Sequence, residues 1–332
     1  MSEAHPKFKA AAVQYAPRFL DLSAGLDLAQ SLIAEAANDG ARLIAFPECW
    51  LPGYPFHVWL GPPAWGLQFQ QRYFDNSLDL QSEHRERLCE MARENKIFVS
   101  MGFSERAGGS LYIAQILIDD CGEVVNSRRK LKPTHVERTV YGEGDGSDLK
   151  VFGTALGQLG QMCCWEHLQP LSRYALYAQN EQVHIAAWPS FSLYTGIAHA
   201  LGPEVNNGAS MMYAAEGQCY VIAPCATVSA EMIEMFSPNH EGLLCEGGGY
   251  TKIYAPDGQS IGTEIAPHEE GLVYADIDLS MIALAKAAGD PAGHYARADV
   301  TCLLLNDQPR RALVSSNDAP TVLDESSLED GA

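Results

Sequence analysis

The chain has few basic residues, with 22 Lys and Arg against 42 Asp and Glu and a formal net charge of −20 over 332 residues. This balance excludes partners held through phosphates or anionic headgroups, so we expect neither nucleic acid nor a membrane surface as a partner. The chain also lacks an unbroken apolar run of the ~18 residues that a spanning helix needs. Its first residues have no cationic lead into an apolar segment. We predict a cytoplasmic protein whose partner is a small uncharged molecule.

Cysteines with metal-binding spacing are missing as well. The nine cysteines are scattered, odd in number and without a Cys-x-x-Cys pair, so we expect neither a disulfide framework nor a structural zinc site. The run Gly247, Gly248 and Gly249 is interpreted as a turn, because no phosphate-binding motif accompanies it. We predict no metal and no cofactor.

What is present is an alternation of apolar runs and helical patterns, with 47% hydrophobic residues to fill a core. Asp21 as N-cap and Gly40 as C-terminal cap delimit one predicted helix, and another is predicted around Leu88 to Ala92. Strands are predicted at residues 8–14, 42–46, 97–103, 111–118, 124–129, near 163, 183–188, 219–223, 249–254 and 271–277. This interleaving favours an α/β fold with a mixed sheet.

No linker divides the chain, so we predict one domain over residues 8–305. Residues 306–332 become polar and lose the apolar pattern. They are interpreted as a trailing or disordered tail.

Three polar residues each follow a predicted strand: Glu48, Lys130 and Cys164. Ligands of open α/β sheets bind beyond the carboxyl ends of the strands. We expect two of these three strands to be parallel neighbours, which would bring the side chains together. A carboxylate, an ammonium and a thiol at one sheet edge would supply a base, an electrophile and a nucleophile.

Cys164 is predicted to start a helix, where unpaired N–H groups and the helix dipole favour ionised sulfur. The alternative is a small buried hydrophobe, as most free cysteines are. Cys163 competes as nucleophile, but strand neighbours point to opposite faces, so only one of the two reaches the site. Strand alternation does not separate Lys130 from Lys132, and their basic cluster with Arg128 and Arg129 is also typical of a solvated edge.

Three motifs in order resemble the signatures of the nitrilase superfamily: Phe46-Pro47-Glu48, Arg129-Lys130-Leu131-Lys132-Pro133-Thr134 and Cys164-Trp165-Glu166-His167. The resemblance covers about residues 8–306 and implies a four-layer αββα sandwich with mixed sheets. It assigns Cys164 as nucleophile, Glu48 as general base and Lys130 as proton donor and electrostatic stabiliser, with Lys132 as the fallback. Glu137 corresponds to a second glutamate of the superfamily; an ordinary salt bridge with Arg138 or another arginine is the alternative.

Flanking residues resemble true nitrilases, and arylacetonitrilases in particular, at residues 51–61, 134–140, 163–168 and 290–295. The resemblance implies hydrolysis of a nitrile to a carboxylic acid and ammonia through a cysteine thioimidate and thioester. It also implies a homo-oligomer built from dimers, which can extend into a spiral filament. An amidase or carbamoylase of the same superfamily is the alternative, and a non-catalytic assembly protein of this fold is a third hypothesis.

Several aromatic and small residues near these motifs are candidates to line a substrate pocket, although such residues are more often ordinary core: Tyr54, Trp59, His135, Trp165, Trp188, Pro189 and Ser190. His135 and His167 also invite a triad with Cys164. His167 lies only three positions beyond Cys164, so we expect it to point away from the thiol and to be structural.

Overall fold

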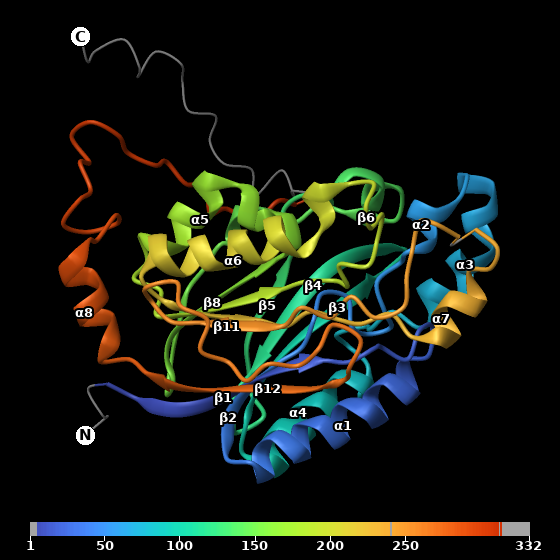
Figure 1. Cartoon of the computed structure of the whole chain (residues 1–332), viewed down its shortest axis with the longest axis horizontal. Coiled ribbons are helices and arrows are strands. Elements are labelled where there is room, and N and C mark those ends of the chain that lie inside the picture. Colours follow the sequence, from blue (N-terminus) through green and yellow to red (C-terminus); the bar gives the residue numbers. More distant parts are fainter. Residues whose placement is uncertain (1–4, 240, 312, 314–332) are drawn as a thin grey trace.

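Two mixed β-sheets lie face to face between two layers of helices in the computed structural model, which describes residues 5–239, 241–311 and 313 (Figure 1). The four-layer sandwich expected from the sequence is confirmed. Residues 312 and 314–332, most of the predicted polar tail, lie outside the described residues. Within the described part of the chain, no helix has the length and apolar character needed to cross a membrane.

The first sheet has the strand order β12-β1-β2-β3-β4-β5, with β6 beside β4. Strands β1, β2 and β3 are parallel, and Leu43 of β2 pairs with Phe98 of β3. The antiparallel pairs are β12 with β1, β3 with β4 and β4 with β5. The bounds are β1 Lys7–Gln14, β2 Ala41–Ala45, β3 Phe98–Ala107, β4 Ser110–Ile118, β5 Val124–Arg129, β6 Tyr141–Gly142 and β12 Gly271–Asp278.

The second sheet has the strand order β11-β10-β9-β8-β7. Its three central strands are parallel, and its two outer strands run antiparallel to their neighbours. The bounds are β7 Phe152–Thr154, β8 Gly157–Cys163, β9 Val183–Ala187, β10 Tyr220–Ala223 and β11 Lys252–Tyr254.

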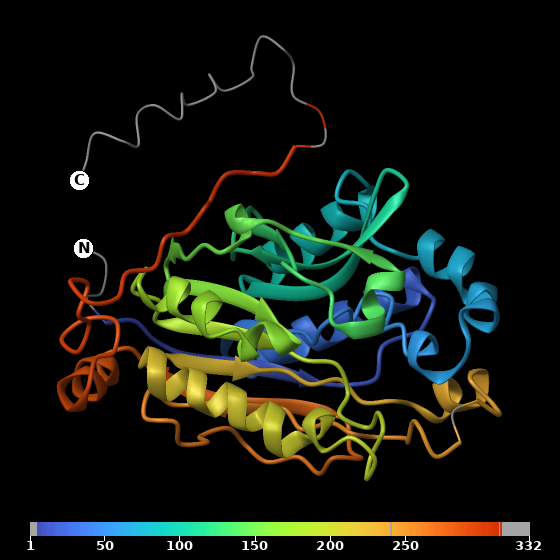
Figure 2. The same ribbon diagram turned by 90° about the horizontal axis from the view of Figure 1, so that it is seen from above.

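Helices cover both outer faces of the sandwich (Figures 1 and 2). Helices α1 (Leu22–Asn38) and α4 (Glu83–Asn95) lie on the first sheet, and α5 (Pro170–Tyr177) and α6 (Pro203–Gly217) lie on the second. At one end of the molecule lie α2 (His57–Leu60), α3 (Pro63–Asp75) and α7 (Ala230–Met235), and α8 (Met281–Ala288) lies at the opposite end.

Local sequence explains the first helix. The side chain of Asp21 accepts a hydrogen bond from the Ala24 N–H at 2.9 Å, as an N-cap does. Gly40, just beyond the end of α1, has a φ of +84°, which glycine adopts without strain. Apolar residues at three- and four-residue steps are buried against the sheet: Leu22, Leu26, Ala29, Ile33 and Ala36. The helix predicted between Asp21 and Gly40 is confirmed.

The core between the two sheets fixes how they face each other. Leu43 and Phe98 of the first sheet belong to one buried cluster with Ile185 and Ile222 of the second. Burial of a large apolar side chain stabilises a fold by about 1.5–3 kcal/mol. The two sheets are therefore held at a fixed distance, and loops that follow strands of different sheets can meet.

Candidate active site

The three strands that precede the predicted catalytic residues are not neighbours. In the first sheet β2 and β5 are separated by β3 and β4, and β8 belongs to the second sheet. The expectation that two of them are parallel neighbours is therefore wrong. Their ends meet because the sheets are stacked: the N–H of Glu48, after β2, donates to the carbonyl of Trp188, after β9, at 3.3 Å.

The Glu48 loop follows directly from β2 and is held against β3. The N–H of Phe46 donates to the Ser100 carbonyl at 2.8 Å, so the chain pairs with β3 for one more residue. A Cβ at Gly102 would lie 2.0 Å from the carbonyl oxygen of Pro47. The backbone before Glu48 can pass this close to β3 only because Gly102 has no side chain.

Lys130 lies between two carboxylates in the interior. Its Nζ is 2.8 Å from Oε1 of Glu48 and 2.9 Å from Oε2 of Glu137, and all three side chains are at most 1% exposed. The other oxygen of Glu48, Oε2, is buried and has no hydrogen-bond partner among the described residues. Glu48 therefore retains one free acceptor oxygen while Lys130 holds the other.

Glu137 is fixed by further donors. It lies in the 3-10 helix His135–Thr139, and its Oε2 accepts from the N–H of Thr134 at 2.5 Å. Tyr54 donates to its Oε1 at 2.7 Å, and Trp59 in turn donates to the Tyr54 hydroxyl at 3.0 Å. Arg138, the alternative partner, instead donates to the carbonyl of His135. Glu137 is therefore paired with Lys130 and not with Arg138.

Cys164 lies at a sharp change of direction between β8 and the 3-10 helix Cys164–Leu168. Its φ is +46°, in the left-handed region that a residue with a Cβ rarely adopts. The side chain is 8% exposed and lines a cavity, whereas Cys163 is fully buried, with its Sγ 3.9 Å from Nη1 of Arg128. The two cysteines point to different surroundings, as expected for strand neighbours.

Arg128 and Glu166, which the sequence did not single out, join the ends of β5 and β8. The two side chains form a bidentate pair at 2.7 and 2.8 Å and are almost completely buried. Glu166 also accepts from the N–H of Leu131 at 2.9 Å and from that of Cys163 at 2.8 Å. One carboxylate therefore binds the residues next to Lys130 and Cys164. Their only sequence signal is position: Glu166 lies within a motif, and Arg128 directly precedes one.

The predicted basic cluster separates into buried and exposed members. Arg128 and Lys130 are both 1% exposed, so a solvated edge is the wrong interpretation for them. Lys132 is exposed and pairs with Glu143 at the surface. Among the two lysines that strand alternation could not separate, only Lys130 reaches the buried carboxylates.

The buried site favours a thiol at rest. Burial raises the pKa of Cys164 well above its ordinary value, and Glu48 raises it further, while Lys130 and the Trp165 N–H oppose these effects without overcoming them. The predicted preference for ionised sulfur at a helix start is therefore not found. The helical segment is only five residues long, and desolvation is the larger effect.

Burial also raises the pKa of Glu48 to about 7, although the Lys130 ammonium opposes this rise. For Lys130, burial acts to lower the pKa, but Glu137 and Glu48 outweigh it and raise that pKa well above its ordinary value. The site thus holds a permanent ammonium and a carboxyl group that titrates near neutrality. Such a carboxyl is suited to accept and return a proton.

Cys164 and Glu137 face a small cavity of about 40 Å³ with mainly aromatic and apolar walls. Of the predicted pocket residues, those that line it are Tyr54, Trp59, Trp165, Pro189 and Ser190. His135 instead stacks on Trp59 from outside, and Trp188 is fully buried behind the site, where its Nε1 donates to Ser210. Lining residues that sequence reasoning missed are Phe56, Thr134, Phe191, Leu193, Leu201 and Asn206.

A second, larger cavity of about 570 Å³ adjoins the first. Phe191 and Leu193 line both. The larger cavity lies between the loop from β9 to α6 and the segments around residues 245–250 and 267–268. These two side chains therefore lie at the boundary between the inner and outer spaces.

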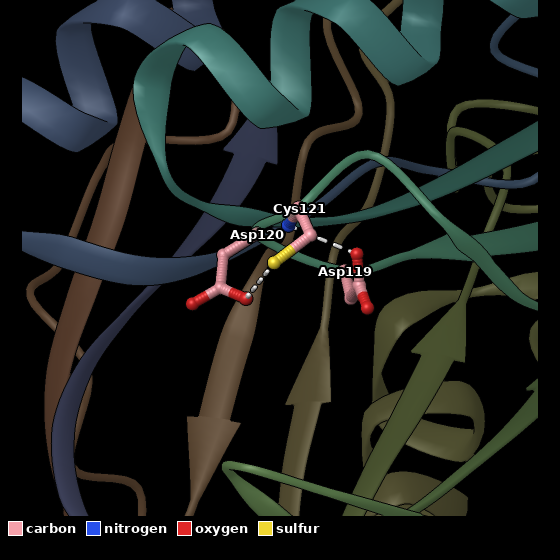
Figure 3. Close-up of side chains that lie close together, drawn as sticks. All are labelled: Asp119, Asp120 and Cys121. Atoms are coloured by element: carbon pink, nitrogen blue, oxygen red, sulfur yellow. Dashed lines mark hydrogen bonds between the residues drawn. The ribbon is translucent and has the colours of Figure 1, made fainter.

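One group of possible metal ligands occurs among the described residues: Asp119, Asp120 and Cys121, in the turn between β4 and β5 (Figure 3). Asp119 Oδ1 accepts from the N–H groups of Cys121 and Glu123, as an Asx turn does. The cluster is explained as turn chemistry, and none of its three residues lines the cavity of Cys164.

The sequence matches the carbon-nitrogen hydrolase family over residues 9–287. It is 56% identical over 314 residues to a protein named "Nitrilase" from Pseudomonas syringae pv. syringae (strain B728a), covering 94% of each chain. It is 52% identical over 300 residues to "Nitrilase, arylacetone-specific" from Alcaligenes faecalis, covering 90% of this chain and 84% of that protein. The chain therefore belongs to the carbon-nitrogen hydrolase family.

The fold agrees with this assignment. The crystal structure of a carbon-nitrogen hydrolase from Helicobacter pylori G27 superposes with a TM-score of 0.72 at 18% identity, covering 90% of this chain and 97% of that chain. Within the family the chain falls in the true nitrilase branch, with relatives of that name at about half identity. Members of this branch are hydrolases that act on the carbon–nitrogen bonds of nitriles.

Proposed function

We propose that this nitrilase hydrolyses arylacetonitriles to carboxylic acids and ammonia, with Cys164 as nucleophile. The observation that supports it best is the buried ammonium of Lys130, held by two carboxylates behind a thiol that faces an aromatic cavity. A nitrile needs a strong nucleophile for its carbon and a donor for its nitrogen. Cys164 and Lys130 would supply these two groups.

The first half of the reaction forms a thioimidate. Glu48 takes the thiol proton of Cys164 as sulfur attacks the nitrile carbon, and the C–N triple bond becomes a double bond. Lys130 and the N–H of Trp165 stabilise the charge that develops on nitrogen, to which Glu48 then delivers the proton. A unit charge about 4 Å away contributes on the order of 4 kcal/mol at an effective dielectric constant of 20.

The second half consumes two water molecules. Glu48 activates the first, which adds to the thioimidate carbon, and ammonia leaves from the tetrahedral adduct to give a thioester. The second water cleaves the thioester and restores the thiol. If sulfur leaves before ammonia, the product is an amide. The balance for the acid route is one nitrile and two waters to one acid and one ammonia.

The walls of the cavity support an aromatic substrate. Tyr54, Trp59, Trp165 and Phe191 surround the space in front of Cys164. The charged side chain among the lining residues is Glu137, which would repel an anionic substrate. At about 40 Å³ the closed cavity holds little more than water, so entry of an aryl group requires side chains at the boundary with the outer cavity to move.

We expect phenylacetonitrile to release ammonia and phenylacetate with a kcat/KM about 2–10 times that of an aliphatic nitrile of similar length, because contacts of its ring with the aromatic walls contribute about 0.5–1.5 kcal/mol beyond burial alone. Ammonia and acid are quantified for a nitrile panel. Phenylacetamide is the matched control, since an amidase or carbamoylase would release ammonia from it at least as fast. Preference for the amide would support that alternative, and no turnover of either would support a non-catalytic protein.

We expect kcat/KM for phenylacetonitrile to fall about tenfold per pH unit below pH 7. Burial raises the pKa of Glu48 to about 7, and below that pH the protonated carboxyl no longer accepts the thiol proton of Cys164. The test is a pH–rate profile of the free enzyme, with melting temperatures measured at each pH to separate inactivation from unfolding. An acid limb near the ordinary value of 4.5 would contradict this role of Glu48.

We also propose a homo-oligomer built from dimers through the outer face of α5 and α6, extending to a spiral filament. That face carries exposed apolar side chains, Leu171 on α5 and Met211 and Met212 on α6. A second copy of the chain would remove this apolar surface from water. Light scattering at working concentration should give a mass of at least two chains; a monomer would refute the proposal.

A further inference from the structure

A chain of hydrogen bonds runs from the backbone of Cys164 into the interior, away from the cavity. Nδ1 of His167 is 2.6 Å from the carbonyl oxygen of Cys164, and its Nε2 is 2.9 Å from Nε2 of His184. Nδ1 of His184 is 2.7 Å from Oε1 of Glu181, whose Oε2 accepts from Tyr213 at 2.5 Å. The four side chains are buried, and the mechanism above uses none of them.

The geometry fixes the proton of His167, and for neutral side chains it also fixes those of His184 and Glu181. A carbonyl oxygen only accepts, so His167 must carry its proton on Nδ1 and, when neutral, accept at Nε2. His184 then donates from Nε2 and accepts at Nδ1. Glu181 must therefore donate from Oε1 as a protonated carboxyl group, which leaves Oε2 free to accept from Tyr213.

The surroundings favour this uncharged arrangement. Burial raises the pKa of Glu181 to about 8 and lowers the pKa values of His167 and His184 well below their ordinary value. Moving the proton from Glu181 to His184 would create two charges in a buried region. In this neutral state each group donates one hydrogen bond to the next: Glu181 to His184, His184 to His167, and His167 to the Cys164 carbonyl.

The series ends on a strained residue. Cys164 has a φ of +46°, a strained conformation that a non-glycine residue keeps only where its surroundings hold it. The hydrogen bond from His167 holds the carbonyl of this residue. The thiol is directed into the cavity only while the backbone keeps this turn.

We propose that Glu181, His184 and His167 are positioning residues, a relay of neutral hydrogen-bond donors that holds the Cys164 backbone in its left-handed turn and so keeps the thiol facing the substrate. None of them touches the substrate. The proposal rests on the proposed function of Cys164 as nucleophile.

Two variants of Glu181 test the relay. Glu181→Gln keeps a neutral donor for His184 and an acceptor for Tyr213, so kcat for phenylacetonitrile should stay within about threefold of the parent. Glu181→Met has a similar length but no donor, so kcat should fall about 10- to 100-fold, with KM within about threefold. Alkylation of Cys164 by iodoacetamide, followed by peptide mass spectrometry, should slow in parallel.

Equal losses in the two variants would overturn the proposal, as would a folded Glu181→Met enzyme with the parental rate. Glu181→Met can also fail to fold. Magic-angle-spinning ¹⁵N NMR of the histidine-labelled parent chain then decides the question, because it reads the tautomers directly. Of the ten histidines, the two signals are assigned by their loss in His167→Gln and His184→Gln.

The spectra should show neutral His167 protonated on Nδ1 and neutral His184 protonated on Nε2. The opposite tautomers, or an imidazolium at either position, would overturn the relay. This readout and the alkylation rate need no turnover. An enzyme without activity on nitriles would therefore refute the proposed function. The histidine tautomers and the alkylation rate would still test the relay.

Discussion

A Cys164→Ala variant should lose hydrolysis of phenylacetonitrile by about 10⁴-fold or more in kcat/KM, because removal of a covalent nucleophile leaves only binding and electrostatic stabilisation. Cys163→Ala is the matched control: it removes the neighbouring sulfur, which is fully buried and lies outside the residues that line the cavity. It should retain activity within a few fold, at a stability loss of about 1–2 kcal/mol.

The covalent step can be observed directly. Parent enzyme quenched in acid during turnover of an arylacetonitrile should carry an acyl or thioimidate mass on the peptide that contains Cys164, and Cys164→Ala should carry none. The two adjacent cysteines are distinguished by repeating the quench with Cys163→Ala. An adduct on any other residue would overturn the assignment of the nucleophile.

An Arg128→Met variant should lose about 3–5 kcal/mol of unfolding free energy at neutral pH, because Glu166 would remain as a buried carboxylate without its charged partner. Both side chains of the pair are at most 4% exposed. Arg129→Met is the matched control, since Arg129 is one third exposed in its pair with Glu105 and should contribute about 1 kcal/mol or less. Urea unfolding of the three proteins measures the difference.

The effect of Arg128→Met should shrink as pH falls. Burial alone would raise the pKa of Glu166, but Arg128 outweighs it and lowers that pKa below its ordinary value. A lowered pKa stabilises the folded parent above the ordinary pKa, and this stability is lost as pH falls through the folded value. The variant can then bury a neutral Glu166. A loss of equal size at pH 4 and pH 7 would show that packing, and not charge, explains it.

Much of the fold could be predicted because the local patterns and the tertiary structure agree. The helix between Asp21 and Gly40 carries its own caps, and each predicted strand corresponds to a strand of the structure within a few residues. Which strands become neighbours could not be predicted from these patterns. Placing β8 in a different sheet from β2 depends on packing between residues far apart in the sequence, such as Leu43 and Ile185, which belong to the same buried cluster between the sheets.

The residues of the candidate site could be predicted where they lie in a recognisable motif. The structure brings Glu48, Lys130 and Glu137 into contact and places Cys164 at the same cavity as Glu137. The sequence did not predict the pair of Arg128 with Glu166 or the hydrogen bond from His167 to the Cys164 carbonyl. A charged residue before a motif has no signal for burial. The spacing of His167 from Cys164 predicted that its ring points away from the thiol, but not that it bonds the Cys164 carbonyl.

Gly102 constrains where Glu48 can lie, although its strand, β3, contributes no side chain to the cavity. Any Cβ at Gly102 would overlap the Pro47 carbonyl, so the location of Glu48, the proposed base, depends on a residue of β3 that has no side chain. Attempts to redesign the cavity in front of Cys164 can therefore change wall residues such as Phe191 and Leu193, whereas the backbone behind Glu48, where Pro47 and Gly102 touch, leaves no room for a side chain.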